Sequence, residues 1–408
     1  MSGTAGWGIP PKRAGIMAQN AERRKVSRML HFTPGSHAHR LITLLSVVGE
    51  YPMNSVCLLG GVQVYKTLIR KMCEKQVVRF DDTSEELETK LLNVSGKGQS
   101  KTIRLYKGSL PILDRMGAGE YYRAAFDNHK FRGDLTHRER NHRVAEAIAM
   151  SMRAGFEVRP YKLVPLQNRE MLRVVSDSPV VYPAKQLKDI GVGERNKTQF
   201  TRLVGALFSG GECYALYNTR NAVMRWGGEG EFKARQALIE AARLNAGIRT
   251  VDTAILFGKS YEIALRTIME SDRCSKNGFR FDRIYPHIIF IPQTDSGIRR
   301  LSLMAIPDWR ERLLDIVFDR DCRSYGRGAF EYDAFVDGKY IYSHLDVDIA
   351  RLIRFRDAWE DMRHDACEIL CYPEQVAYLR EYLGRGAAIV TIRPEQIEAA
   401  MKHKEETD

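Results

Sequence analysis

The feature that most constrains the fold is an N-terminal run of three expected short helices followed by a two-stranded β-ribbon. Residues 39–50 place leucine and valine at the i, i+3, i+4 and i+7 positions of one helix face: Leu41, Leu44, Leu45 and Val48. Pro52 can open a second short helix that ends near Gly60 and Gly61, a pair suited to a tight turn. A third helix is expected over residues 62–75. This order of helices and ribbon predicts a winged helix-turn-helix.

The third expected helix has two unlike faces. Its apolar side combines positions i, i+4 and i+8 with two neighbours: Val64, Leu68, Met72, Tyr65 and Ile69. Its other side carries amide, hydroxyl and cationic groups: Gln63, Lys66, Thr67, Arg70 and Lys71. A helix that is apolar behind and polar in front is typical of a major-groove reader, so these five side chains are predicted to contact DNA. The alternative is an amphipathic helical subdomain whose cations form a solvated face.

The expected ribbon would supply the wing. Residues 76–80 and 101–106 are β-rich, and we expect them to pair with each other. Lys97 and Lys101 lie among glycine and serine at the tip, and these two side chains and Arg104 are predicted to touch the DNA backbone. The intervening segment begins with a run of acids, which would repel phosphates, so that part is expected to point away from DNA.

The distribution of charge also favours a polyanionic partner at the N-terminal end. The net charge is +12, and residues 1–80 contain 12 Lys or Arg against three acids, which leaves only +3 for the rest of the chain. Residues 1–36 are expected to form a flexible basic arm along DNA phosphates through Arg23, Arg24, Lys25 and Arg28. An unstructured tail is the alternative. An anionic membrane would attract the same charge, but residues 1–30 lack a large apolar face.

Several classes of protein are disfavoured by composition. No apolar stretch approaches the roughly 18 residues of a membrane span, and no signal-peptide core is evident, so no membrane partner is expected. The seven cysteines are scattered without CxxC pairs, which suits a reducing compartment and neither a disulfide framework nor a zinc site. We therefore expect a cytoplasmic, nucleoid-associated protein without a cofactor or a bound metal.

The remainder of the chain alternates strands and helices. A helix is predicted over 138–154, a hairpin over 203–218 and a further helix over 231–244, with more strand–helix pairs beyond. This alternation predicts an α/β body with a mixed sheet, joined to the α+β head by a connector over 107–135. The expected domains are the arm at 1–36, the winged helix at 37–120 and the α/β domain at 136–408, with a possible sub-boundary near 247.

Two short motifs resemble catalytic signatures without their context. His37 and His39 have the spacing of the metal-binding pair of rolling-circle nickases, but they fall at the expected start of a helix instead of on a strand. Residues 258–260 read Gly-Lys-Ser between a strand and a helix, yet Thr253 occupies the position of the first glycine of a phosphate-binding loop. We expect neither motif to be catalytic.

A metal-dependent nuclease of the PD-(D/E)xK kind needs an acid on one strand and (D/E)xK on the next. The hairpin at 203–218 is the natural place for these acids, and neither expected strand carries them. The short pattern occurs elsewhere, at Glu231, Glu88 and Asp337, on a helix, in a loop and at a hairpin turn. We therefore predict no catalytic residues and keep a Mg²⁺-dependent nuclease or nickase as the alternative. Trp226 is expected to pack under the helix that follows it.

Together these segments resemble the replication-relaxation family of plasmids and integrative conjugative elements. The resemblance rests on the winged-helix pattern at 40–106, the helix segment NHRVAEA at 141–147 and the hairpin segments LVGALF and CYALYNT. It implies sequence-specific binding of double-stranded DNA, accessory to plasmid replication, relaxation or transfer or regulating it. It also implies a nuclease-like α/β core, here degenerate because the acids are absent, which serves as a scaffold or a platform for a homodimer. Other replication or transfer proteins are further candidate partners, and a scaffold that uses the winged helix for protein contacts is a third hypothesis.

Overall fold

The computed structural model divides into two compact units, an N-terminal unit (Met1–Phe131) and a C-terminal unit (Arg132–Asp408). The residues that the structure describes are 29–80, 86–116, 119–129, 135–158, 160, 163–164, 172–175, 178–189, 202–224, 229–274, 280–324, 331–361, 367–384 and 386–405. Several sequence predictions lie outside these residues, namely those for Arg23, Arg24, Lys25, Arg28 and Trp226.

The first two helical predictions are close to the structure. Helix α2 (His37–Val48) buries the leucine and valine face expected of it, and Ser36 caps its start by accepting from the His39 amide at 3.2 Å. The short strand β2 (Glu50–Pro52) follows, and then a 3₁₀ helix, η1 (Met53–Leu58). The second expected helix is therefore present as a tighter 3₁₀ turn.

The third helix is present but its buried face is shifted from the prediction. Helix α3 (Val62–Met72) ends three residues before the expected bound. Its buried residues are Tyr65, Ile69 and Met72, whereas Val64 is 52% exposed. Since the i, i+4, i+7 set already fills the interior, the helical period turns Val64 toward solvent. The assignment of Val64 to the apolar face was wrong.

The predicted pairing of the wing strands was also wrong. Strand β3 (Gln76–Phe80) pairs in parallel with β1 (Met29–Phe32) and antiparallel with β4 (Glu86–Thr89). Strand β6 (Thr102–Leu105) instead lies between β2 and β5 (Leu92–Ser95). Each of the two hairpins joins neighbours that are close in sequence, so closing it costs less chain entropy than the long loop of the predicted ribbon.

The rest of the N-terminal unit is helical. The segment that was expected to be a connector forms η3 (Lys107–Ser109), α4 (Leu110–Arg115) and α5 (Glu120–His129). Helix α5 packs on α2 and α4, and Ile112 and Leu113 of α4 are buried. These helices cover the α2 side of the core, within the same compact unit as α3.

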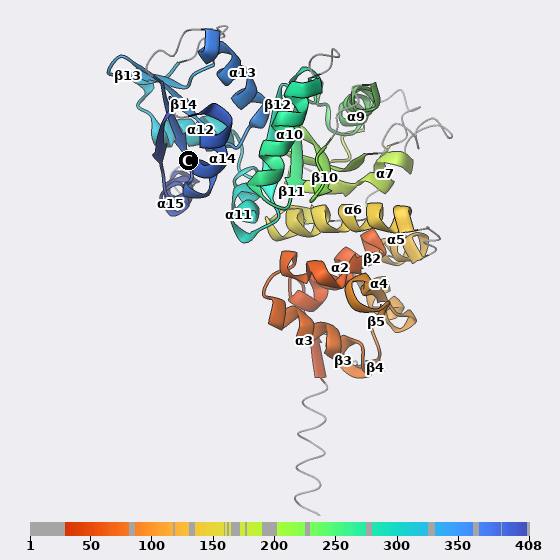
Figure 1. Ribbon diagram of the computed structural model, residues 1–408. Helices are drawn as coiled ribbons and strands as arrows, with labels where there is room; N and C mark the ends of the chain where they lie inside the picture. Colours follow the sequence, from red (N-terminus) through yellow and green to blue (C-terminus); the bar gives the residue numbers. More distant parts are fainter. Residues whose placement is uncertain are drawn as a thin grey trace, which may run out of the picture. The chain divides into compact units, whose positions relative to one another are not determined.

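The C-terminal unit is built on a mixed six-stranded sheet (Figure 1). Its strand order is β12-β11-β10-β9-β8-β7, with these bounds: β7 (Glu157–Val158), β8 (Val180–Pro183), β9 (Leu203–Ser209), β10 (Glu212–Arg220), β11 (Thr253–Gly258) and β12 (His287–Pro292). The hairpin β9–β10 confirms the prediction at 203–218, and its neighbours are antiparallel β8 and parallel β11.

Helices cover this sheet and connect its strands. The long helix α6 (Leu135–Arg153) confirms the helix predicted over 138–154. It packs across β8, β9 and β10. The other helices around the sheet are α7 (Ala184–Asp189), α9 (Glu229–Ala246), α10 (Tyr261–Cys274) and α11 (Asp295–Leu303). The possible sub-boundary near residue 247 falls in the segment between α9 and β11. Strand β11 pairs directly with β10 in the same sheet.

A second sheet of four strands continues the same unit. Its order is β13-β14-β15-β16, with bounds Ala334–Val336, Lys339–Ser343, Cys367–Cys371 and Ala388–Thr391, respectively. The helices beside it are α12 (Trp309–Val317), α13 (Ile349–Asp361), α14 (Val376–Leu383) and α15 (Pro394–Glu405). The segment before α13 pairs with β12, and one hydrophobic core runs from the first sheet into the second. The chain is thus a mixed α/β protein. Of the described helices, none is long and apolar enough to cross a bilayer.

Candidate nucleic-acid interface

The turn before α3 positions the predicted recognition residues. Gly60 has φ +147°, and a side chain there would bring its Cβ to 3.0 Å from the Tyr65 ring. Because only glycine adopts this backbone freely, the pair before α3 permits the sharp entry into the helix. The exposed residues of α3 include Gln63, Lys66, Arg70 and Lys71, whereas Thr67 is half-buried.

The opposite side of α3 is fixed to the core of the N-terminal unit. The buried Tyr65 ring lies 5.0 Å, centroid to centroid, from His37 of α2, and its hydroxyl is 3.3 Å from His37 Nδ1. The Leu91 amide, just before β5, donates to the Met72 carbonyl at 3.0 Å. These contacts set the rotation of the helix, so its polar side chains share an outward direction.

The cations of α3 have no salt-bridge partner among the described acids. Among the residues that the structure describes, none forms a salt bridge with Lys66, Arg70 or Lys71. Arg70 and Lys71 lie in the last turn, where the carbonyl end of the helix dipole stabilises positive charge. The surface therefore presents positive charge to solvent, with an amide and a hydroxyl beside it.

A second cationic element is the tip of the β5–β6 hairpin. Gly96 has φ +89°, and a Cβ there would lie only 2.4 Å from the Ser100 carbonyl oxygen, so the tight turn requires glycine. Lys97 and Lys101 are exposed at this tip. The Met53 amide donates to the Lys101 carbonyl at 2.8 Å, which ties the hairpin to the start of η1. We call Gln63, Lys66, Thr67, Arg70 and Lys71 of α3, with Lys97 and Lys101 of the tip, the α3–hairpin surface.

Arg104, the third residue of the expected wing predicted to contact DNA, does not belong to this surface. Its Nε donates to Glu50 Oε2 at 2.8 Å, and its Nη2 donates to the same oxygen. Glu50 is only 1% exposed, and the two residues face each other across β2 and β6. The structure therefore gives Arg104 an ion pair within the sheet.

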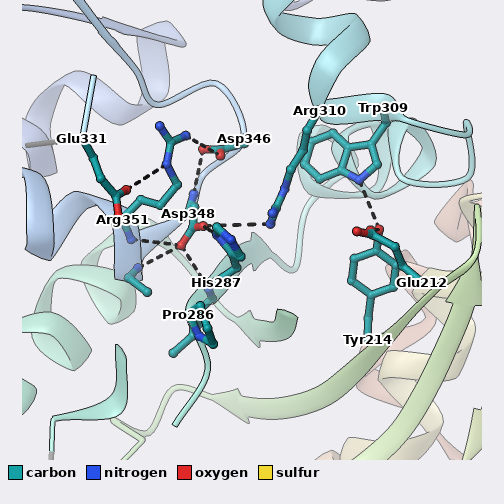
Figure 2. Close-up of polar contacts among 12 residues, drawn as sticks. Glu212, Tyr214, Pro286, His287, Trp309, Arg310, Glu331, Asp346, Asp348 and Arg351 are labelled. Atoms are coloured by element: carbon teal, nitrogen blue, oxygen red, sulfur yellow. Dashed lines mark hydrogen bonds and ion pairs between the residues drawn. The ribbon is translucent and has the colours of Figure 1, made fainter. Parts of the chain in front are cut away.

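The C-terminal unit contains a different polar cluster, between β12 and α13 (Figure 2). The fully buried Asp348 carboxylate accepts from the amides of Ile288 and Ala350, both at 3.0 Å, and lies 2.7 Å from His287 Nδ1. Arg351 donates to Asp333 at 2.8 Å and to Asp346 at 3.0 Å, and it also pairs with Glu331. We call these residues the Asp348 cluster.

The electrostatics of the Asp348 cluster favour the charged forms of Asp348 and Arg351, whereas burial raises the pKa of Asp333 above its ordinary value. Burial alone would raise the pKa of Asp348, but the hydrogen bond and charge of His287 and the charges of Arg310 and Arg351 hold it well below its ordinary value. Burial would lower the pKa of Arg351, and the surrounding acids raise it instead. Asp348 also accepts from the first amides of α13, so it caps this helix and joins it to β12.

The β9–β10 hairpin, which is the natural place for the acids of a nuclease, carries a salt-bridge network at one end. Strand β9 has no acid, and Glu212, the one acid of β10, is hydrogen-bonded by the Tyr214 hydroxyl. At the other end of β10, Arg220 donates to Glu146 of α6 through Nε at 2.7 Å and through Nη2 at 2.8 Å. Within the described part of the chain, no group of three or more His, Cys, Asp or Glu residues could hold a metal ion.

The two short motifs that resemble catalytic signatures, the His37/His39 pair and residues 258–260, have local structural roles. His37 and His39 lie in the first turn of α2, as expected for a helix start. Gly258 ends β11, where an added Cβ would lie 2.6 Å from the Phe290 ring. Close packing against Phe290 thus accounts for a glycine at position 258, and no phosphate-binding loop is needed to explain it.

The sequence did not reveal the Asp348 cluster, because its members are far apart in the chain. His287 and Asp348 are 61 residues apart and meet only when β12 pairs with the segment before α13. The one local signal was an aspartate directly before a helix, which is typical of an N-cap. Comparison of the chain with protein-family models, curated proteins and solved structures returned no match.

Proposed function

We propose that this chain is a sequence-specific double-stranded DNA-binding protein of a mobile genetic element, accessory to plasmid replication, relaxation or transfer or regulating it. The observation that carries the proposal is the α3–hairpin surface. There, a helix fixed by its apolar side exposes an amide and cations that have no acidic partner among the described residues, and a hairpin tip adds two more lysines. Cations of this kind neutralise phosphates, and amide and guanidinium groups can read base edges.

The order of elements supports a winged helix-turn-helix in the N-terminal unit. Helix α2 is followed by β2, η1 and α3, and the hairpin β5–β6 then returns to pair with β2. In that interpretation α3 is the recognition helix and the β5–β6 tip is the wing. The β3–β4 hairpin and β1 are then additions to the motif, inserted between α3 and the wing or placed before α2.

The order of elements in the C-terminal unit supports a nuclease-like core. Helix α6, three antiparallel strands β8–β9–β10, helix α9 and the parallel strand β11 follow one another. We infer that this core is degenerate and serves as a scaffold, because its hairpin lacks the paired acids that would bind Mg²⁺. Dimerisation through this unit and contacts with other replication or transfer proteins remain predictions.

Selection from random duplexes tests the proposal. The full-length protein is incubated with a pool of random double-stranded oligonucleotides, and the bound fraction is sequenced over several rounds. We expect one motif to be enriched, with an affinity that falls as salt rises because phosphate contacts release counterions. No enrichment, together with no gel shift at low salt, would overturn the DNA-binding proposal and favour a protein-contact role.

A plasmid assay tests the alternative of a Mg²⁺-dependent nuclease or nickase. Supercoiled plasmid is incubated with the protein and Mg²⁺ or Mn²⁺, with and without EDTA. We expect the plasmid to stay supercoiled. Metal-dependent nicking that EDTA abolishes, and that follows the protein through purification, would show that the core is active and would contradict the scaffold role.

A further inference from the structure

A cavity of about 550 Å³ lies in the C-terminal unit between the first half of α6 and one end of the β9–β10 hairpin. Three arginines line it: Arg140 and Arg143 from α6, and Arg202 just before β9. Asn218 and Thr219 contribute polar groups from the end of β10. A cavity of this size is large enough for a small-molecule ligand such as a mononucleotide.

The described residues that line this cavity carry more positive than negative charge. Against the three arginines stands one acid, Glu139, and Arg220 already donates to its carboxylate at 2.7 Å. Burial lowers the pKa of Arg140 below the ordinary value, because it penalises the charged form of the guanidinium. Because a guanidinium stays protonated in proteins, that charge favours an incoming anion.

Arg143 adds an unsatisfied donor. Its Nε is buried and has no hydrogen-bond partner among the residues described, while its backbone carbonyl accepts from Asn218 Nδ2 at 2.8 Å. A buried N–H without an acceptor is costly, and an oxygen of a ligand in the cavity would satisfy it. Arg202 Nη1 donates to the carboxylate of the buried Glu231 at 2.8 Å.

The acids nearest the cavity are already engaged. Arg220 pairs with Glu146 through two nitrogens, and Asn218 Nδ2 lies 3.3 Å from Glu146. Arg220 has φ +55°, a conformation that side chains rarely adopt, and its ion pairs with Glu139 and Glu146 offset that strain. Glu139 and Glu146 are thus both paired with Arg220.

We propose that this cavity, lined by Arg140, Arg143 and Arg202, binds a phosphoryl group, supplied by a free nucleotide or by a nucleic-acid strand. The planar guanidinium fork matches phosphate oxygens and forms charge-assisted hydrogen bonds with them. The site lies wholly in the C-terminal unit. It goes beyond the function proposed above and does not depend on α3 reading DNA.

Anisotropy of methylanthraniloyl-ATP, measured in EDTA, tests the site in the full-length protein. The measurement is made in an Arg70→Ala, Lys71→Ala background, so that the α3–hairpin surface contributes little. We expect the probe to bind, and inorganic phosphate to displace it. Adding Arg140→Gln and Arg143→Gln should weaken binding by roughly tenfold or more. Arg153→Gln is the matched control, because Arg153 lies at the far end of the same helix, in a pair with the exposed Asp295. It should leave binding unchanged.

Competition then separates the two sources of phosphate. Displacement of the probe by a short thymidine oligonucleotide at lower concentration than by ATP would identify a nucleic-acid strand, and the reverse order would identify a free nucleotide. Either order supports the proposal. Absence of probe binding, or equal binding by the Arg140/Arg143 variant and the parent, would overturn it. In either case the duplex-selection experiment still decides the DNA-binding proposal independently.

Hydrogen exchange on the unmutated protein tests the location of the site without depending on the folding of a variant. With methylanthraniloyl-ATP present, amides in residues 136–143 and 217–224 should exchange more slowly than without it, because these segments line the cavity. Slower exchange confined to other segments would contradict the assigned location.

Discussion

The α3–hairpin surface and the Asp348 cluster use the same kinds of side chain in opposite ways. On the α3–hairpin surface, Arg70 and its neighbours are exposed and have no described acidic partner. In the Asp348 cluster, Arg351 is half-buried among three acids, and each acid is itself hydrogen-bonded. Charge alone therefore does not distinguish the two regions; the presence or absence of an acidic partner among the described residues does.

The difference has an energetic consequence. Removing one member of a buried, paired network leaves its partners desolvated and unsatisfied, which strongly destabilises the folded state. Removing an exposed cation changes stability little, because water already screens it. Substitutions in the Asp348 cluster should thus lower stability, and those on the α3–hairpin surface should lower affinity for DNA.

The largest expected effect is that of Asp348→Ala. This change removes the acceptor of the Ile288 and Ala350 amides and leaves His287 and Arg310 beside an apolar side chain. We expect a loss of about 3–5 kcal/mol in the free energy of unfolding, measured by urea titration. Glu240→Ala, which breaks an exposed pair with Arg243, should cost less than about 1 kcal/mol. Equal effects of the two changes would remove the distinction between the regions.

A pH effect of similar size should come from His344, which is fully buried beside the Asp348 cluster. Its Nε2 is hydrogen-bonded with the Tyr378 hydroxyl, and burial lowers its pKa to about 4. Asp346 and Asp348 favour its protonation, whereas Arg351 and Arg300 oppose it. Because the unfolded chain takes up this proton near pH 6.5 and the folded chain only near pH 4, stability should fall by about 3 kcal/mol across that window.

Urea titrations at about pH 7 and about pH 4.5 measure this decrease in stability, and His344→Asn is the comparison. The variant should show a smaller difference between the two pH values than the wild type. Because the pKa of Asp348 is depressed in the folded protein, its contribution to stability is fully present above about pH 4. The titration of Asp348 therefore does not contribute to the decrease measured between these two pH values. An identical pH dependence of variant and wild type would show that His344 does not titrate as proposed.

A smaller stability effect is expected from Arg104→Ala. Glu50 is buried and would be deprived of its hydrogen bonds from Arg104, so the change should cost about 1–3 kcal/mol. Lys101→Ala, at the exposed tip three residues away, should change stability by less than about 0.5 kcal/mol. If Arg104→Ala were as harmless as Lys101→Ala, its ion pair with Glu50 would have no stabilising role.

The smallest expected effect is on the salt dependence of DNA binding. Lys97→Ala with Lys101→Ala should reduce the slope of log affinity against log salt by about two, roughly one for each phosphate that is no longer neutralised. The preference for one duplex sequence over another should not change, because phosphate contacts carry no sequence information. An altered sequence preference with an unchanged slope would assign the tip a base-reading role instead.

Features set by local periodicity were predictable from the sequence, and features set by distant partners were not. Helix α2 and the β9–β10 hairpin were predicted near their observed bounds, because their apolar spacing and turn residues lie within one short window. The partner of β3 was missed, since β1 lies more than forty residues earlier, in a segment expected to be a flexible arm.

The same limit applies to the candidate site. The cations of α3 were identified by helical period, which also showed that they share a side distinct from the buried one. Arg104 was misjudged because its β-strand position gave no sign of buried Glu50 on the facing strand. The arginine-lined cavity was not predicted either, because α6 and the end of β10 meet only in the folded unit.

The most direct test of the central claim combines affinity and stability for Arg70→Ala with Lys71→Ala. Binding to the selected duplex is measured by anisotropy over a salt series, and unfolding is measured by urea titration. We predict that binding weakens by about 1–3 kcal/mol for each base-reading side chain removed, with stability changed by less than about 0.5 kcal/mol. Wild-type affinity of this variant for the selected duplex at every salt concentration would contradict the assignment of α3 as the DNA-reading helix.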